Sequence, residues 1–124
     1  MLDSSAVIAV LRREPGAAIV ERYLSDALIS AVTLQEIVKV LLSDGALQDV
    51  AHAMIDPLNL NVAAHEVDDA WAAALLWKAT KSKGSGLGDR TCMALAIKEG
   101  VPAVTTDKAW AELSIPGLTV ILAR

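Results

Sequence analysis

The chain has 124 residues, which is enough for one domain with one hydrophobic core and too few for two. Hydrophobic residues make up 54% of it and the formal net charge is −4, which argues against a broad nucleic-acid-binding face but allows a local basic strip. No apolar run reaches the roughly 18–20 residues that cross a bilayer, and no secretory signal pattern opens the chain, so we expect a cytoplasmic protein without a membrane segment.

Short apolar strands alternate with amphipathic helices along the chain. Strands are expected at 1–3, 27–32, 58–62, 101–105 and 118–122. Helices are expected at 6–13, 17–24, 33–42, 46–55, 68–80, 89–99 and 108–113, with a glycine-rich loop at 81–88. Strands that alternate with helices are joined by crossover connections, so the pattern predicts an α/β fold whose mainly parallel sheet is covered on both faces.

The core has to be built mostly from aliphatic side chains, because the chain contains no phenylalanine and one tyrosine. We expect Trp71, Trp77 and Trp110 to supply the remaining bulk, although Trp77 could alternatively stack on a base. Cys92 is the single cysteine, which excludes an internal disulfide and a cysteine metal cluster. It lies in an apolar helical stretch and is expected to be a small core residue.

Four acidic residues stand near the starts of expected helices: Asp3, Glu36, Asp89 and Asp107. Each has an ordinary structural explanation, because aspartate is a preferred N-cap residue and the helix dipole stabilises acids in the first turn. Thr33 and Glu36 even match the spacing of a capping box. Taken singly, none of the four indicates a site.

Taken together, the four acids indicate a metal site. The carboxyl ends of parallel strands meet at one edge of a sheet, so these side chains could converge there. Two carboxylates about 4 Å apart repel by roughly 4 kcal/mol at an effective dielectric near 20, so such a cluster takes up protons or a cation. Mg²⁺ and Mn²⁺ prefer oxygen ligands, and a carboxylate-held ion suits phosphodiester hydrolysis. The hydroxyls of Ser5 and Thr105 are candidates to orient a carboxylate, or they belong to ordinary turns.

Three segments together resemble the PIN domain, and in particular the VapC-type toxins of bacterial toxin–antitoxin pairs. They are "LDSSAVIAVLRREPG", "SAVTLQEIVKVL" and "GLGDRTCMALAIKEGVPAVTTDKAW". The resemblance covers essentially the whole chain, so it implies a single PIN domain over residues 1–124 with a three-layer α/β/α fold.

The resemblance also implies a function. It implies a Mg²⁺- or Mn²⁺-dependent ribonuclease that cuts structured RNA such as tRNA, stops translation, forms a homodimer and is neutralised by a cognate antitoxin. The family's acidic quartet falls on Asp3, Glu36, Asp89 and Asp107, and its supporting polar residues fall on Ser5 and Thr105.

The chain departs from the family pattern at two places. Only two residues precede Asp3, where relatives have a few more strand residues, so either the first strand is short or the true start of the protein lies upstream. The α-amino group could then lie near Asp3. Leu34 occupies the position where many relatives have asparagine, which removes one hydrogen-bonding side chain near Glu36.

RNA needs a basic surface, because affinity for nucleic acid comes largely from cations that neutralise phosphates. The best candidates surround the glycine-rich loop: Lys81, Lys83 and Arg90, with Lys78 nearby. These residues could equally be solvated cations at helix ends. Residues 33–55 are rich in apolar side chains, which form either an antitoxin groove or ordinary core.

Other functions remain possible at this stage. A haloacid-dehalogenase-type phosphatase would use Asp3 as its nucleophile but needs a second aspartate where Ser5 stands. A PIN nuclease of housekeeping RNA processing would share the same chemistry. A catalytically inert PIN interaction module would be expected to lack one of the acids.

Overall fold

The computed structural model describes the whole chain, Met1–Arg124. Its strands are short: β1 (Leu28–Ser30), β2 (Asn61–Ala63), β3 (Ala103–Thr105) and β4 (Val120–Leu122). Its α-helices are α1 (Ser4–Arg12), α2 (Ala17–Glu21), α3 (Ala31–Ser43), α4 (Gln48–Ile55), α5 (Val67–Leu75), α6 (Trp77–Thr80) and α7 (Leu87–Glu99). Four 3-10 turns complete it: η1 (Leu24–Asp26), η2 (Asp56–Leu58), η3 (Lys81–Lys83) and η4 (Lys108–Glu112).

All the strand pairing is parallel. β1 pairs with β2, and β3 pairs with β4. The first residues of the chain lie between these two pairs, because Leu2 forms a parallel bridge with Val104 and its N–H donates to the carbonyl of Leu28 at 2.9 Å. The strand order is therefore β2, β1, the N-terminal segment, β3 and β4. Because the pairing is parallel, the carboxyl ends of paired strands lie at the same edge.

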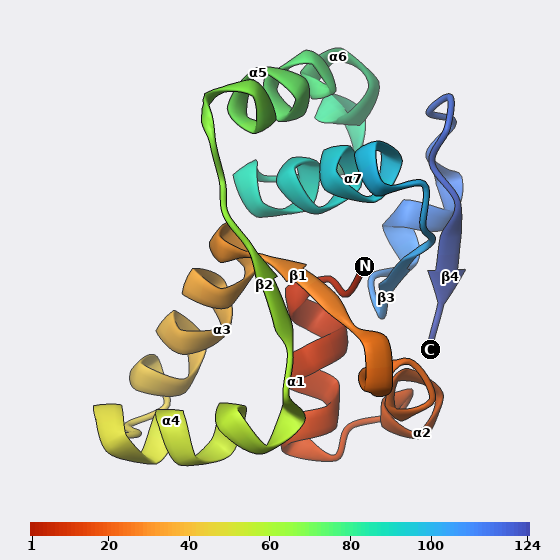
Figure 1. Cartoon of the computed structure of the whole chain (residues 1–124). Coiled ribbons are helices and arrows are strands. Elements are labelled where there is room, and N and C mark those ends of the chain that lie inside the picture. The colour runs from red at the N-terminus through yellow and green to blue at the C-terminus, as the bar shows by residue number, and fades with distance from the viewer.

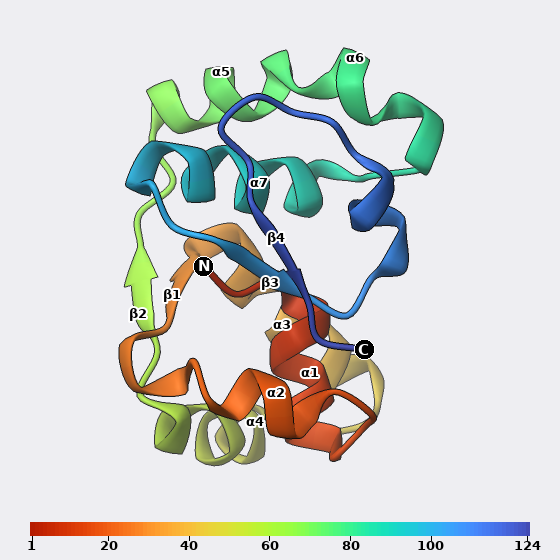
Figure 2. The same cartoon turned by 90° about the vertical axis from the view of Figure 1, so that its right-hand side faces the viewer.

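Helices cover both sides of these strands. Figures 1 and 2 show α5, α6 and α7 on one side and α1 to α4 on the other. Adjacent residues of a strand point to opposite faces, so Leu2 and Val104 enter the core beneath α1 and α3, while Met1 and Ala103 enter the core beneath α7. The predicted α/β arrangement with a parallel sheet between two helical layers is confirmed.

Several boundaries differ from the prediction. The apolar run 27–32 is a strand only as far as Ser30, because Ser30 caps α3 and the helix begins at Ala31. The long helix expected at 68–80 is interrupted at Leu76, and the helix expected at 108–113 is the 3-10 turn η4. No helix in the chain is both long enough and apolar enough to span a bilayer.

The tryptophans do not all behave as expected. Trp110 is buried and Cys92 is fully buried in the core beneath α7, as predicted. Trp71 and Trp77, however, are 68% and 57% exposed, so the prediction that they belong to the core is wrong. The buried side of α5 is formed by the small residue Ala73, and the large side chains of this helix face outward.

Candidate functional site

Asp3 is buried at the carboxyl edge of the strands. It is only 2% exposed, and it precedes α1 without capping that helix through its side chain. Its Oδ2 accepts hydrogen bonds from the hydroxyls of Ser5, at 2.6 Å, and Thr105, at 2.9 Å. Its Oδ1 is buried and has no partner. A buried carboxylate oxygen without a donor is costly, so this atom is available for a ligand.

The Ser5 and Thr105 hydroxyls also fix the backbone that leads to Asp107. Ser5 and Thr105 lie 3.1 Å apart, and Ser5 accepts from the N–H of Thr106. Thr105 accepts from the N–H of Asp107 at 3.0 Å. The end of β3 is therefore tied to the start of α1, which explains why these positions carry hydroxyl side chains.

Asp89 and Asp107 both cap helices, as the ordinary explanation predicts. Asp107 Oδ1 accepts from the N–H of Ala109 at the start of η4, at 2.9 Å, and the residue is exposed. Asp89 lies in the first turn of α7, and its Oδ2 accepts from the N–H of Gly86 at 2.8 Å. Each cap uses one carboxylate oxygen, so capping does not exclude a second role for either acid.

Glu36 is not part of a capping box. The N-cap of α3 is Ser30, whose hydroxyl accepts from the N–H of Thr33 at 2.9 Å, so the box predicted from Thr33 and Glu36 is wrong. Glu36 lies in the second turn, and its carboxylate crosses to α7, where it occupies the space beside Gly88 that a Cβ would fill. Its Oε2 is buried and has no partner.

The four acids influence one another electrostatically. Burial raises the pKa of Glu36 above its ordinary value, and the charges of Asp3 and Asp89 add to this shift while Ser4 opposes it. Burial also raises the pKa of Asp89, again with contributions from the charges of Asp3 and Asp107, against the opposing Gly86 N–H. Raised pKa values on neighbouring carboxylates indicate uncompensated negative charge, which a cation would relieve.

The four carboxylates are the kind of ligand that a hard divalent cation prefers, but their side chains do not converge on one point in this structure. No three acidic, histidine or cysteine side chains lie close enough to hold a metal ion without moving. Asp89 and Asp107 are each turned toward the N–H that they cap. The unpartnered oxygens of Asp3 and Glu36 are the features that favour a cation, because Mg²⁺ and Mn²⁺ bind through carboxylate oxygens and water.

The predicted RNA-binding residues have different surroundings. Arg90 lines a hollow of about 420 Å³ together with Glu36, Gly88 and Leu87, and its guanidinium donates to the carbonyl of Ser85 at 2.7 Å. Lys83 forms an ion pair with Glu112, and the ammonium of Lys81 lies 5.2 Å from the ring centre of Trp77. Arg90 therefore lies beside the acids, whereas both lysines are engaged with other groups.

Contrary to expectation, the α-amino group does not lie beside the Asp3 carboxylate. The α-amino group of Met1 donates to the carbonyl of Pro102 at 2.9 Å, so it is held at β3 rather than at the carboxylate of Asp3. Leu34 lines an apolar groove on the outer side of α3, facing away from the acids.

Gly88 is a residue of the site that the sequence pattern did not indicate. It was part of the expected flexible loop, but it lies inside the first turn of α7 and is buried. The glycine that directly precedes Asp89 in "GLGDR" was the available signal, but only the structure shows that a side chain there would meet Glu36.

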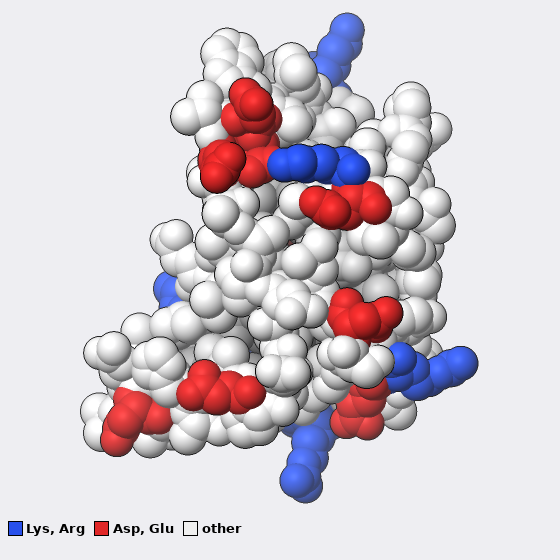
Figure 3. Space-filling model, in the orientation of Figure 1, with Lys and Arg blue, Asp and Glu red and all other residues white.

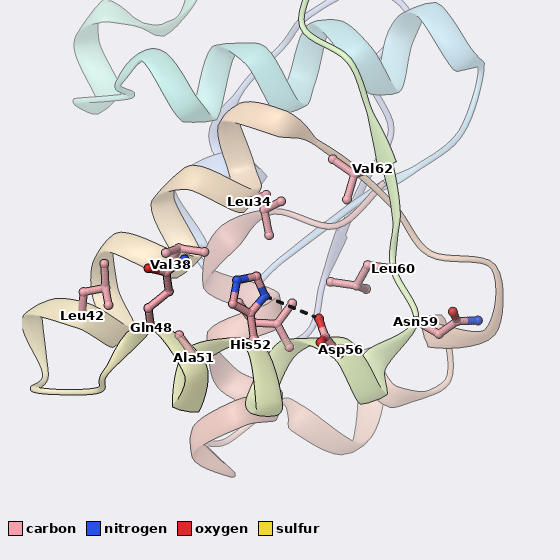
Figure 4. A pocket seen from close by; sticks show the side chains of 11 residues that line it. Leu34, Val38, Leu42, Gln48, Ala51, His52, Asp56, Asn59, Leu60 and Val62 are labelled. Carbon is pink, nitrogen blue, oxygen red and sulfur yellow. Dashed lines mark ion pairs between the residues drawn. The ribbon is translucent and has the colours of Figure 1, made fainter.

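A second hollow lies on the other helical layer. A groove of about 450 Å³ runs between α3, α4 and β2 (Figure 4). Its floor is mostly aliphatic, and His52 and Asp56 form a pair at its rim with 3.9 Å between Nδ1 and Oδ1. Acidic side chains lie over α4 on this face (Figure 3). Residues 33–55 therefore contribute to both of the expected alternatives: Leu34, Val38 and Leu42 line the groove, and Ile37 and Leu41 belong to the core.

Comparison with known proteins gives a family match and two structural neighbours. The family model "PIN domain" matches residues 1–116. VapBC2 from Rickettsia felis, crystallised with a DNA fragment from its promoter, superposes with a TM-score of 0.75 at 18% identity, covering 98% of this chain and 96% of that chain. DNA-bound VapBC from Salmonella typhimurium superposes with a TM-score of 0.75 at 20% identity, covering 100% of this chain and 97% of that chain. No curated protein matches the sequence. At these identities the two neighbours establish the shared fold.

Proposed function

Because the chain belongs to the PIN-domain family, we propose that it is a metal-dependent endoribonuclease and the toxin of a VapC-type toxin–antitoxin pair. The observation that carries the proposal is Asp3, a buried acid whose Oδ1 has no partner and whose charge helps to raise the pKa of both Glu36 and Asp89. The structural neighbours are both toxin–antitoxin complexes, which supports the toxin assignment over a role in housekeeping RNA processing. All four family acids are present, which argues against an inert interaction module.

The proposed cofactor is Mg²⁺ or Mn²⁺, held by Asp3, Glu36, Asp89 and Asp107. Such an ion would lower the pKa of a bound water and stabilise charge on the phosphoryl oxygens. The protein's own contribution is to hold the carboxylates in place: the Ser5 and Thr105 hydroxyls fix Asp3 through its Oδ2 and leave Oδ1 free.

The proposed substrate is structured RNA such as tRNA, bound across the start of α7. Arg90 is the best-placed cation, because it lines the same hollow as Glu36. Lys81 and Lys83 lie in η3, just before the loop that leads to Asp89. RNA phosphate would have to replace Glu112 as the partner of Lys83. A small basic strip of this kind is compatible with a net charge of −4.

The proposed protein partner is a cognate antitoxin that places a helix in the groove between α3 and α4. The groove offers aliphatic side chains such as Leu34, Val38 and Leu60, and its acidic surroundings favour a helix with basic flanks (Figures 3 and 4). The toxin would act in the cytoplasm, where its RNA substrate is found.

The proposed function is tested by cleavage of labelled tRNA with purified protein in Mg²⁺ or Mn²⁺. We expect cleavage that EDTA abolishes and that Asp3→Asn lowers by at least two orders of magnitude, because the buried ligand loses its charge. Asp68→Asn, which removes an exposed acid on α5, is the matched control and should cleave like the wild type.

Induced expression in a bacterial host separates a toxin from a housekeeping nuclease. Growth arrest is expected with the wild type and not with Asp3→Asn. Cleavage that persists in EDTA would contradict the metal, and cleavage without growth arrest would favour the housekeeping alternative.

A further inference from the structure

Gly88 is the point of α7 against which the Glu36 carboxylate of α3 lies. It is buried in the first turn of α7, a helix of 13 residues. A Cβ built on Gly88 would overlap all three atoms of the Glu36 carboxylate group. The carboxylate of one helix therefore occupies the volume of a missing side chain on the other, directly before Asp89 in the sequence.

No backbone requirement explains a glycine here. Gly88 has an ordinary helical conformation, unlike Gly84 and Gly100, which have positive φ values of 67° and 65°. Glycine is a poor helix former compared with alanine, so a glycine inside α7 weakens the helix. Gly86, two residues earlier, has no atom within 4 Å of its hypothetical Cβ. The space taken by Glu36 is what distinguishes position 88.

We propose that Gly88 is a positioning residue: its missing side chain lets the Glu36 carboxylate lie against the start of α7, where Glu36 and Asp89 can ligate the same cation. Any side chain at position 88 displaces this carboxylate. The carboxylate is at the far end of the flexible Glu36 side chain, so it can rotate outward while the fold is retained. The inference rests on the proposed metal-dependent function and adds to it a residue that carries no ligand atom.

The direct test is the affinity of Gly88→Ala for Mn²⁺, measured by isothermal titration calorimetry. We expect a loss on the order of 10- to 100-fold, as is typical when a group that orients a metal ligand is changed. Circular dichroism in EDTA should show unchanged helix content, because alanine favours the helix. Gly86→Ala is the matched control, since its Cβ enters open space and its N–H to Asp89 is kept, and it should bind Mn²⁺ like the wild type.

A double-mutant cycle with Glu36→Ala separates positioning from a general structural effect. If residue 88 acts only through Glu36, then Glu36→Ala combined with Gly88→Ala should bind Mn²⁺ with the affinity of Glu36→Ala alone. The double variant also tests the proposal if Gly88→Ala alone fails to fold, because Glu36→Ala removes the carboxylate atoms that the new Cβ would overlap. It is then expected to fold, and its failure to fold would overturn the proposal.

Two further results would overturn the inference. Wild-type affinity in Gly88→Ala would show that Glu36 keeps its place despite the side chain, while leaving the proposed nuclease function intact. Additive losses in the cycle would show that residue 88 acts through another group. Absence of Mn²⁺ binding in the wild type would instead remove the proposed function itself, and the inference with it.

Discussion

The orientation of Asp3 depends on Thr105. The Thr105 hydroxyl donates to Asp3 Oδ2 and accepts from the N–H of Asp107, so one buried side chain serves two of the acids. A turn threonine could be replaced at little cost, but a threonine that holds a buried carboxylate could not.

Thr105→Val should therefore be strongly destabilising although it keeps the shape of the side chain. It leaves the Asp107 N–H without its acceptor and Asp3 Oδ2 with Ser5 as its remaining donor, and we expect a loss of about 1–3 kcal/mol in the free energy of unfolding. Urea denaturation in EDTA measures this loss, and tRNA cleavage should fall with it. Thr106→Val is the matched control, because the Thr106 side chain is buried but makes no hydrogen bond. Equal stability of the two variants would contradict the proposed support of Asp3.

At the scale of elements, helix starts carry most of the site, and they were the least predictable feature. The apolar stretch 27–32 looks like one strand because propensity does not show where a serine side chain turns back onto its own backbone. Ser30 does so here, and α3 begins two residues earlier than expected. That change frees Glu36 from the predicted capping box. The positions of Asp3 and Asp107 after strands were predictable, since each follows an apolar run.

Ser30→Ala tests the corrected start of α3. Removing the hydroxyl that accepts from the Thr33 N–H should lower the free energy of unfolding by about 1 kcal/mol. Ser43→Ala, at the exposed end of the same helix, should change it by less than about 0.5 kcal/mol. Both values come from chemical denaturation, and an equal effect of the two substitutions would argue against Ser30 as the cap.

At the scale of the whole molecule, the sequence predicts the layers better than it predicts the outer surface. The alternation of strands and helices specifies a parallel sheet between two helical layers, because crossover connections allow little else. It is harder to predict which face of a helix packs against the rest of the protein when the buried residues of that helix are small. On α5 the buried residue is Ala73, so the position of Trp71 could not be deduced from apolar spacing.

The exposed apolar side of α5 is the surface on which we expect two copies of the chain to associate. Val67, Trp71 and Leu75 are all exposed and follow one another at helical spacing of four, so they form one stripe along the helix. A contiguous exposed apolar patch is uncommon on a monomer, and a stripe that meets its own symmetry copy suits a two-fold dimer.

Trp71→Lys should convert such a dimer to a monomer, because a dimer would have to bury two facing charges at the centre of the stripe. Sedimentation velocity at micromolar concentration measures the change, and circular dichroism should show the fold intact because Trp71 is already exposed. Leu47→Lys is the matched control: Leu47 is 70% exposed like Trp71, but it lies at the start of α4 in the other helical layer. A wild-type chain that sediments as a monomer, or a Leu47→Lys variant that dissociates equally well, would contradict the assignment of the dimer face to α5.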